Sequence, residues 1–353
     1  MTTLPEPELL DVRGLVQEFR LPRRLPFAPP RVVHAVSDVS FKLRTGECLG
    51  LVGETGCGKS TLARAIMQAP PPVRGQVRFQ GHELVGVRRS ELRRLRRGMQ
   101  YVFQDPFASL DPTWKVRDLV AEPMRIAGGI SRQQANARVD EMLQLVGLSA
   151  ERYASRHPRE LSGGQCQRVA VARALTLAPK LLICDEVVSG LDVSIQAQLL
   201  NLLETLRRDL GLAYLFISHD LGVVRHLCDR VAVMYLGKVV ETGPADLVYK
   251  RPLHPYTAAL LAAVPRIGQG PSRARPEWAR LGGELPSPLA PPAGCRFRTR
   301  CPRAAARCAA EEPPLVPDAA GHAAACHFPL HEPPSATACP EPAAASATLQ
   351  GQA

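Results

Sequence analysis

The stretch that decides the fold is Gly53-Glu54-Thr55-Gly56-Cys57-Gly58-Lys59-Ser60-Thr61. It follows a short apolar run, Cys48 to Val52, and precedes a segment of helical character, Leu62 to Met67. Strand, glycine-rich loop and helix in this order make a P-loop, whose backbone N–H groups surround phosphate oxygens without interference from Cβ atoms. Lys59 is placed to reach the β- and γ-phosphates, and Ser60 to ligate Mg²⁺. The sequence therefore predicts a site for a nucleoside triphosphate.

A second, acidic element decides between hydrolysis and transfer. The run Leu181 to Cys184 is typical of a buried strand, and it ends in Asp185 and Glu186 at the carboxyl edge of the predicted sheet. There Asp185 can orient Mg²⁺, and Glu186 can polarise an attacking water. Another apolar run ends in Ser218-His219-Asp220, where His219 can contact the γ-phosphate, although alone it would read as a structural histidine. This pattern favours hydrolysis.

Short apolar runs alternate with longer amphipathic segments from Cys48 onward, which predicts a parallel sheet covered by helices. Before them, alternating residues at Leu9–Phe19 and Val36–Leu43 predict strands on either side of the Pro/Arg-rich Leu21–Arg31. Helical periodicity dominates from about 105 to 175, which indicates an inserted helical subdomain. We expect an α/β fold with a RecA-like P-loop NTPase core, an amino-terminal antiparallel β subdomain, this helical subdomain and a small cysteine-containing carboxy-terminal extension.

The expected domain boundaries are 8–250 for the ATPase domain, 251–330 for the extension and 331–353 for a low-complexity tail predicted to be disordered. With 353 residues and 45% hydrophobic content, the chain can bury one large core and carry a smaller unit. No run approaches the roughly 18 to 20 apolar residues of a membrane span, and Met1 to Asp11 lacks the pattern of a signal peptide. We therefore expect a cytosolic chain.

The net charge of +11 is compatible with nucleic acid or an anionic membrane surface as a partner. Many arginines, however, lie in helical-looking stretches such as Arg88–Arg97, where a solvated helix face is the simpler interpretation.

The segment Leu161-Ser162-Gly163-Gly164-Gln165, followed by an apparent helix with Gln167, Arg168 and Arg173, is the most specific in the chain. With the elements above, it resembles the signature of the ABC ATPase family. In that family the serine and glycines, at the start of a helix, bind the γ-phosphate of the nucleotide held by the partner subunit's P-loop, which is again an anion site.

The resemblance also implies the roles of two loops. Gln104 belongs to the loop that senses magnesium, together with Ser60 and Asp185, and that contacts the membrane subunit. Ser189-Gly190-Leu191-Asp192 forms the loop that crosses the dimer interface. The family stacks an aromatic side chain on adenine from the amino-terminal β region. Phe27 is the nearest candidate here, although it could equally be a hydrophobic anchor.

This sequence departs from the family pattern at two positions. Val187 stands where proline is common after the acidic pair, and Gly190 stands where alanine is usual in the interface loop. Neither change removes a reacting group, so the resemblance still implies a competent half of each of two composite sites, with Lys59, Glu186 and His219 as catalytic residues.

Several stretches resemble the oligopeptide and dipeptide importer branch of this family. They are Gln104 to Pro112, His157-Pro158, Cys184-Asp185-Glu186, Leu253 to Thr257 and Gly283 to Pro302. The resemblance implies a heterodimer with a second, related ATPase, two integral membrane permease subunits and, indirectly, an extracytoplasmic peptide-binding protein. It also implies a peripheral location on the cytoplasmic face of the cell membrane.

The ten cysteines fall into two populations, and five of them crowd the end of the chain. Cys295, Cys301, Cys308 and Cys326 have the spacing C-x5-C-x6-C-x17-C, and the resemblance implies that they hold a 4Fe-4S cluster. Zinc would accept the same ligands, and a metal-free extension is the third alternative. Cys339 lies in the low-complexity tail and is expected to be free.

Two other functions stay open from the sequence. An importer of nickel, glutathione or another small solute would use the same ATPase type. A soluble ABC ATPase acting on nucleic acid or ribosomes is disfavoured, because the chain has one P-loop and no sustained heptad run. We therefore expect ATP and Mg²⁺ as ligands and no nucleic acid partner, whereas a heterodimer and a homodimer cannot be distinguished in a single chain.

Overall fold

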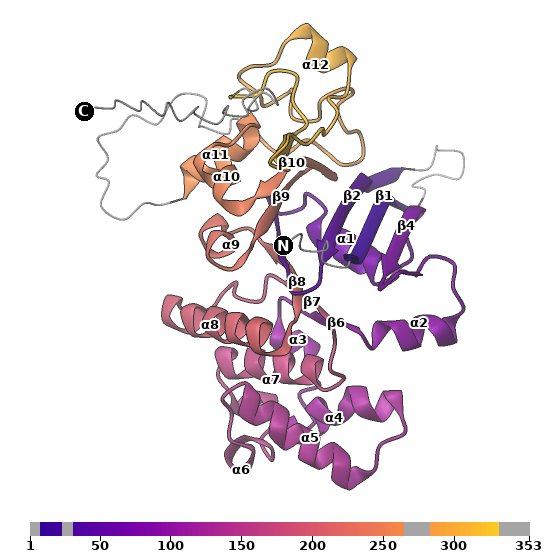
Figure 1. Cartoon of the computed structure of the whole chain (residues 1–353), viewed down its shortest axis with the longest axis vertical. Coiled ribbons are helices and arrows are strands. Elements are labelled where there is room, and N and C mark those ends of the chain that lie inside the picture. The colour runs from indigo at the N-terminus through magenta and orange to yellow at the C-terminus, as the bar shows by residue number, and fades with distance from the viewer. Residues whose placement is uncertain (1–7, 23–30, 265–282, 332–353) are drawn as a thin grey trace, which may run out of the picture.

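The computed structural model describes residues 8–22, 31–264 and 283–331. Two sheets occupy the middle of an elongated molecule, a group of helices lies at one end and a loop-rich segment at the other (Figure 1). We call residues 251–331 the C-terminal extension. After β1 the described residues end at Pro22, so Phe27 lies outside them. Cys339 and the tail from residue 332 also lie outside the described residues.

The larger sheet has seven strands in the order β11-β10-β9-β3-β8-β7-β6. The five strands from β9 to β6 run parallel, and β10 and β11 add antiparallel at one edge. The strands are β3 (Cys48–Val52), β6 (Met99–Val102), β7 (Leu181–Asp185), β8 (Ala213–Ser218), β9 (Arg230–Tyr235), β10 (Lys238–Pro244) and β11 (Ala323–Ala324).

The two faces of this sheet bury different side chains because successive residues of a strand point to opposite sides. Ile183, Leu215 and Ile217 contribute to one core, together with α1 and the smaller sheet. Cys184 and Phe216 contribute to the other, together with the helical layer. Burial on both faces explains why these strands are continuous apolar runs in the sequence.

The smaller sheet is antiparallel and has the order β2-β1-β4-β5. Its strands are β1 (Glu8–Arg20), β2 (Val32–Arg44), β4 (Arg74–Phe79) and β5 (His82–Glu83). β1 and β2 extend beyond the expected ranges by one to four residues at each end. The expected amino-terminal β subdomain is thus present, and it also recruits residues that follow the P-loop helix.

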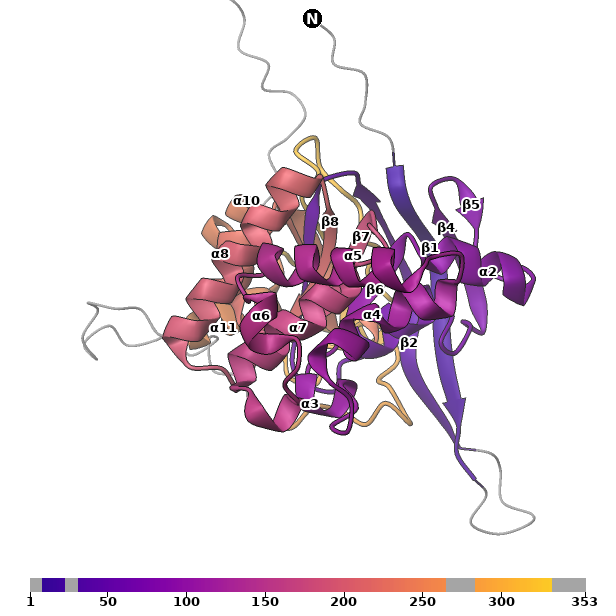
Figure 2. The ribbon, with the colours of Figure 1, turned by 90° about the horizontal axis from the view of Figure 1, so that it is seen from below.

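Helices cover the parallel sheet and build the subdomain at the end of the molecule (Figure 2). They are α1 (Lys59–Ile66), α2 (Arg89–Arg96), α3 (Pro106–Ser109), α4 (Val116–Ala127), α5 (Arg132–Leu145), α6 (Ala150–Tyr153), the 3₁₀ turn η1 (Pro158–Glu160), α7 (Gly163–Leu175), α8 (Val193–Leu210), α9 (Leu221–Leu227), α10 (Ala245–Lys250), α11 (Pro255–Ala263) and α12 (Ala306–Ala310). α3 to α7 form the helical subdomain, and Val139, Met142 and Leu143 are buried in it as their spacing predicts.

The arginine-rich stretch forms α2, and most of its side chains are exposed. Arg96 is an exception, because its guanidinium donates to the carbonyls of Met67 and Gln68 at 2.8 and 2.9 Å. No helix among the described residues is both long enough and apolar enough to cross a membrane.

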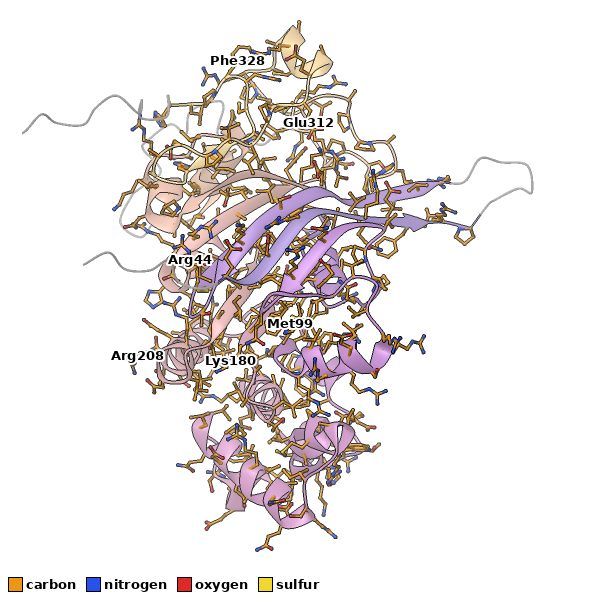
Figure 3. The ribbon with its side chains drawn as sticks, turned by 45° about the vertical axis from the view of Figure 1, so that its right-hand side comes forward. Arg44, Met99, Lys180, Arg208, Glu312 and Phe328 are labelled. Carbon is orange, nitrogen blue, oxygen red and sulfur yellow. The ribbon has the colours of Figure 1, made fainter. Side chains whose placement is uncertain are left out.

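The C-terminal extension packs against the ATPase core through a strand pair and buried hydrogen bonds. β11 pairs with β10, and the fully buried carboxylate of Glu241 in β10 accepts from the backbone N–H groups of Leu253 and His254, each at 2.8 Å. His322 contacts the same carboxylate at 2.7 Å. Figure 3 shows Glu312 and Phe328 in this extension, at the opposite end of the molecule from the helical subdomain. The expected α/β fold with its β subdomain, helical subdomain and cysteine-containing extension is confirmed.

Candidate functional site

The P-loop connects β3 to α1 in a conformation that requires glycine at two positions. Gly53 and Gly58 have φ values of 153° and 107°. A Cβ atom on Gly58 would lie 2.1 Å from the Ala35 carbonyl oxygen, and one on Gly53 would lie 2.2 Å from that of Met234. Neither the Ala35 nor the Met234 carbonyl can move away without displacing the strand to which it belongs. The loop is thereby locked between β2 and the end of β9, with its N–H groups at the amino end of α1.

Lys59 is the first residue of α1 and is only 4% exposed. Its ammonium group donates to the carbonyls of Gly53 and Glu54 at 2.8 and 3.0 Å. A buried ammonium needs such acceptors, and two carbonyls of its own loop supply them. The amine is therefore held over the loop, where it can exchange a carbonyl for a phosphate oxygen.

The P-loop lines a cavity of about 570 Å³ that is large enough for a nucleotide. Predicted residues from four separate segments meet there. The predicted lining residues are Thr55, Gly56, Cys57, Gly58, Lys59, Ser60, Thr61, Gln104, Glu186 and His219.

The sheet order explains why these segments meet. Gln104 follows β6, Glu186 follows β7 and His219 follows β8, and these three strands are neighbours. The P-loop follows β3, the next strand after β8. Because the carboxyl ends of parallel strands share one edge, all four loops reach the same crevice.

Asp185 lies at the end of β7, 3% exposed, and is held by two hydroxyl groups. Ser60 donates to its Oδ1 at 2.9 Å, and Tyr101 donates to its Oδ2 at 2.5 Å. Burial and then the Asp185 carboxylate raise the pKa of the Tyr101 phenol, so it remains a hydrogen-bond donor. A carboxylate beside a serine hydroxyl is a donor set that suits Mg²⁺, which prefers oxygen ligands.

Glu186 is oriented by two polar side chains and by its own backbone. The Gln104 side-chain amide donates to its Oε2 at 2.9 Å, and Nδ1 of His219 lies 3.3 Å from the same atom. The residue has φ of 49°, a left-handed conformation that costs a non-glycine residue about 1 to 3 kcal/mol and is often found at functional sites. This turn directs the carboxylate into the cavity rather than along the strand.

The predicted signature residues lie at the start of α7. Ser162 is the N-cap of α7 and makes a reciprocal capping box with Gln165. A Cβ atom on Gly164 would lie 2.4 Å from Ile195 of α8, so glycine permits close packing of the two helices. Leu161, Ser162, Gly163, Gly164 and Gln165 do not line the P-loop cavity in the described part of the chain.

The predicted interface loop connects β7 to α8. Gly190 in this loop has φ of 72° with open space around its Cα, so alanine there would be strained although it would not clash. Val193, the first residue of α8, is 84% exposed, which leaves a large apolar side chain at the surface beside the loop. Val187 is buried at 1% exposure, which explains why an apolar residue is tolerated after the acidic pair.

Three residues near the cavity were not anticipated from the sequence. Phe19, the penultimate residue of β1, lines the cavity and is 38% exposed. Arg300 and Tyr256 of the C-terminal extension both bind Glu54 of the P-loop. Phe19 could have been found as an aromatic at the end of a predicted strand, whereas no local signal connects the other two to the P-loop.

The four clustered cysteines lie in the described part of the extension, where Cys308 is buried and the other three are half-buried. Burial, followed by smaller effects of Cys301, Cys295 and Cys308, raises the pKa of the Cys326 thiol to about 11. The four thiols are therefore within electrostatic reach of one another. Among the described residues, however, no group of three or more Cys, His, Asp or Glu side chains is arranged to hold a metal ion.

Comparison with known families identifies two segments. A family described as "ABC transporter" matches residues 36–189, which contain the P-loop, the signature and the acidic pair. A second family, "Oligopeptide/dipeptide transporter, C-terminal region", matches residues 240–308, which include three of the four clustered cysteines.

Curated proteins match most of the chain. A probable peptide ABC transporter ATP-binding protein of Sinorhizobium fredii is 53% identical over 84% of this chain and 83% of its own length. The oligopeptide transport ATP-binding protein OppF of Salmonella typhimurium is 50% identical over 84% of this chain and 89% of its own. Among solved structures, the dimeric post-hydrolysis state of the ATP-binding cassette MJ0796, bound to ADP and Pi, is 26% identical with a TM-score of 0.60, covering 67% of this chain and 99% of that one.

Proposed function

Because this chain belongs to the ATP-binding subunits of ABC transporters, we propose that it binds and hydrolyses ATP to energise peptide import across the bacterial cytoplasmic membrane. The observation that carries the ATPase part is the position of Glu186, fixed by Gln104 and His219 in the cavity that Lys59 and Ser60 also line. The peptide part rests on the relatives and on the extension matched at residues 240–308.

ATP binding is assigned to the P-loop. Backbone N–H groups from the part of the loop that lines the cavity would surround the β- and γ-phosphates, and the amino end of α1 adds its dipole. Lys59 exchanges a carbonyl partner for phosphate oxygens, which it can do because its acceptors are loop carbonyls within 3.0 Å. Mg²⁺ bound at this site neutralises phosphate charge, and Ser60, Asp185 and Gln104 are the residues that would hold it.

Hydrolysis is assigned to Glu186 as the residue that orients and polarises water. Gln104 and His219 hold its carboxylate by the contacts described above, so little rotamer freedom remains to be lost in the reaction. His219 is 53% exposed in its side chain and can turn toward the γ-phosphate. Each of these groups follows a neighbouring strand of the same sheet, which supports their joint action.

Adenine is assigned to Phe19 instead of Phe27. Phe19 belongs to β1 of the β subdomain, the region from which the family contributes its aromatic residue, and it lines the P-loop cavity. A partly exposed phenylalanine ring offers a flat apolar face for stacking. Phe27 lies outside the described residues.

A second ATPase subunit is required to complete each site. The signature at the amino end of α7 is an anion site of its own, outside the P-loop cavity. We assign it to the nucleotide on a partner chain, with residues 189–192 at the interface. The dimeric cassette among the similar structures supports this pairing. We propose a heterodimer with a related ATPase, as the importer branch implies.

Two membrane permease subunits are the proposed partners at the helical subdomain. A groove of about 370 Å³ lies where α2, β6, α4 and α7 meet, and Phe103 and Ile126 line it with 40% and 65% exposure. Gln104 directly follows Phe103, so a permease helix bound in this groove would contact the loop that carries Gln104. The chain would then lie peripherally on the cytoplasmic face of the membrane, beneath permeases served by an extracytoplasmic peptide-binding protein.

A 4Fe-4S cluster is the metal that we propose for Cys295, Cys301, Cys308 and Cys326. Support comes from the donor set, four thiols in one extension, of which Cys308 is buried and the other three are half-buried. Zinc would accept the same four thiolates, so the metal analysis must distinguish the two. Anaerobic purification followed by iron, sulfide and zinc analysis tests the proposal, and a folded extension without metal would contradict it.

The function is tested by ATP hydrolysis in the complex reconstituted with its permeases, partner ATPase and binding protein. Peptides presented by the binding protein should stimulate turnover. Stimulation by nickel chelates or glutathione, but not by peptides, would replace the peptide assignment with one of those solutes. Absence of hydrolysis under all conditions would contradict the ATPase assignment itself.

A further inference from the structure

The C-terminal extension reaches into the P-loop through Arg300. Its guanidinium makes a bidentate pair with Glu54, with Nη1 2.8 Å from Oε2 and Nη2 3.1 Å from Oε1. The Arg300 side chain is 7% exposed and that of Glu54 24%, so water screens the pair only weakly. Parallel hydrogen bonds of this kind fix the orientation of both groups.

The backbone of Glu54 is held by the same extension. Its N–H donates to the hydroxyl of Tyr256 at 2.9 Å, and Tyr256 in α11 is fully buried. The carbonyl of Glu54 accepts from Lys59 at 3.0 Å. Side chain, N–H and carbonyl of one P-loop residue are therefore all engaged, two of them by residues more than two hundred positions later.

The turn that carries Arg300 is itself rigid. The N–H of Arg300 donates to the carbonyl of Phe297 at 3.0 Å. The Phe297 ring packs against Tyr235 and Tyr256 at centroid distances of 5.2 and 5.4 Å, and it is 2% exposed. An aromatic cluster shared by the core strand β9 and the extension thus determines where the guanidinium lies.

Charge gives the contact a second consequence. Glu54 is the only acidic residue between Gly53 and Thr61, and it lies beside a site for a polyanion. Without a neighbouring cation, the Glu54 carboxylate would repel the phosphates, and its partial burial would limit the screening of that repulsion by water. Arg300 compensates that charge. A guanidinium stays protonated in proteins, so the bidentate contact places a full positive charge against Glu54.

We propose that Arg300 is a positioning residue for ATP binding. Through Glu54 it holds the P-loop in its phosphate-binding conformation and compensates the one carboxylate of that loop. The extension is in this way part of the support of the nucleotide site, independently of what its cysteines bind. The inference rests on the proposed ATP-binding function, so the wild-type chain must bind ATP in the same assay.

The experiment measures the affinity of the full chain for a fluorescent ATP analogue with Mg²⁺, and KM and kcat in the assembled complex. Arg300→Met should weaken nucleotide affinity and raise KM by about tenfold, while kcat at saturating ATP stays within about twofold. Arg300→Lys keeps the charge and should restore most of the affinity. Arg307→Met breaks an exposed pair with Glu311 in the same extension and should change neither value.

The double variant separates positioning from general damage to the extension. Arg300→Met and Glu54→Gln disrupt the same contact, so together they should bind ATP no more weakly than Arg300→Met alone. Losses that multiply, or an Arg300→Met affinity within twofold of the wild type, would overturn the proposal. Should Arg300→Met not fold, Glu54→Gln and Arg300→Lys carry the same comparison. A wild-type chain that binds no nucleotide would instead overturn the proposed function.

Discussion

At the scale of single residues, Glu186 is held in place more firmly than a surface carboxylate. It combines a left-handed backbone, a hydrogen bond from Gln104 and a contact with His219. The strain is compensated by two further bonds, because the Glu186 N–H donates to Ile217 and its carbonyl accepts from the Ser189 hydroxyl. Such an arrangement fixes a reacting group before substrate arrives.

Replacing Glu186 with glutamine tests this role. Glutamine keeps the size and can still bond to Gln104, but it cannot accept a proton from water. ATP hydrolysis should fall by at least about 100-fold, whereas ATP affinity should stay within about twofold. Single-turnover kinetics and equilibrium binding measure the two quantities. Glu204→Gln on the exposed face of α8 is the matched control, and undiminished hydrolysis in Glu186→Gln would refute the assignment.

His254 makes the stability of the chain depend on pH. It is the N-cap of α11, where its Nδ1 accepts from the Tyr256 N–H at 3.1 Å. Burial lowers its pKa from 6.5 to about 4, with Glu241 opposing the shift. Between these values the unfolded chain binds a proton that the folded chain does not. The contribution of His254 is therefore complete above pH 6.5 and is lost as the pH falls toward 4.

The expected loss is about 3 kcal/mol of unfolding free energy across that window. His254→Asn retains a side-chain acceptor for the helix N-cap but cannot titrate. Its urea unfolding curves should thus depend less on pH between 6.5 and 4 than those of the wild type. Parallel pH profiles for the two chains would show that His254 is protonated in the folded state.

At the scale of elements, the junction of β3 and α1 depends on contacts with another strand. Gly56 and Gly58 both have positive φ, at 82° and 107°, but their surroundings differ. A Cβ atom on Gly56 meets nothing within 4 Å, whereas one on Gly58 collides with the backbone of Ala35 in β2. The two glycines therefore separate backbone strain from a clash between elements.

Gly56→Ala should lower the unfolding free energy by about 1 kcal/mol, the cost of the strained backbone alone. Gly58→Ala should cost about 3 kcal/mol, because β2 must move as well. Denaturant unfolding of the two variants measures the difference. Equal losses of unfolding free energy in the two variants would show that β2 can move away from residue 58 at no cost. The close contact between Gly58 and β2 would then not hold the P-loop in place.

Local signals were sufficient for the elements but not for all of their contacts. The order of strand, glycine loop and helix predicted β3 and α1, and the acidic pair after Cys184 predicted the end of β7, because both depend on neighbours in sequence. The meeting of Glu186 and His219 followed from the rule that parallel strands share a carboxyl edge, whereas the place of Gln104 was implied only by the family resemblance.

Contacts from distant segments could not be predicted in this way. Arg300 reaches Glu54 across 246 residues, and neither position has a pattern that indicates the other. Phe19 lines the cavity although the sequence predicted only its strand, because strand periodicity does not show which residue at the strand end reaches the P-loop. In addition, β11 extends the central sheet with only two residues, too few to show a period in the sequence.

At the scale of the whole molecule, the P-loop cavity and the predicted signature lie on different elements of the chain, and the signature residues do not line the cavity. Ser162 and its capping box lie at the start of α7, and the cavity is lined from other elements. Two chains closing on two nucleotides would bring each signature to the opposite P-loop. In a heterodimer, damage to the signature of this chain should therefore appear on the partner.

Photoactivatable ATP cross-linked to each subunit of the complex measures where the damage appears. Ser162→Arg should reduce labelling of the partner ATPase by about tenfold, because the large side chain removes the N-cap hydroxyl and fills the anion site at the start of α7, and should leave labelling of this chain within about twofold. Lys59→Ala should have the reverse effect. Ser131→Arg is the matched control, because Ser131 also caps a helix with a capping box in the same subdomain.

The pattern of labelling distinguishes the remaining arrangements. Equal loss from both bands in Ser162→Arg would contradict asymmetric pairing, and it would indicate a homodimer if only one kind of chain is recovered. Loss from this chain alone would mean that the signature serves its own P-loop, which requires α7 to rotate toward the cavity within one subunit. Because the signature residues lie outside the cavity and Gly164 packs closely against Ile195, we expect loss from the partner alone.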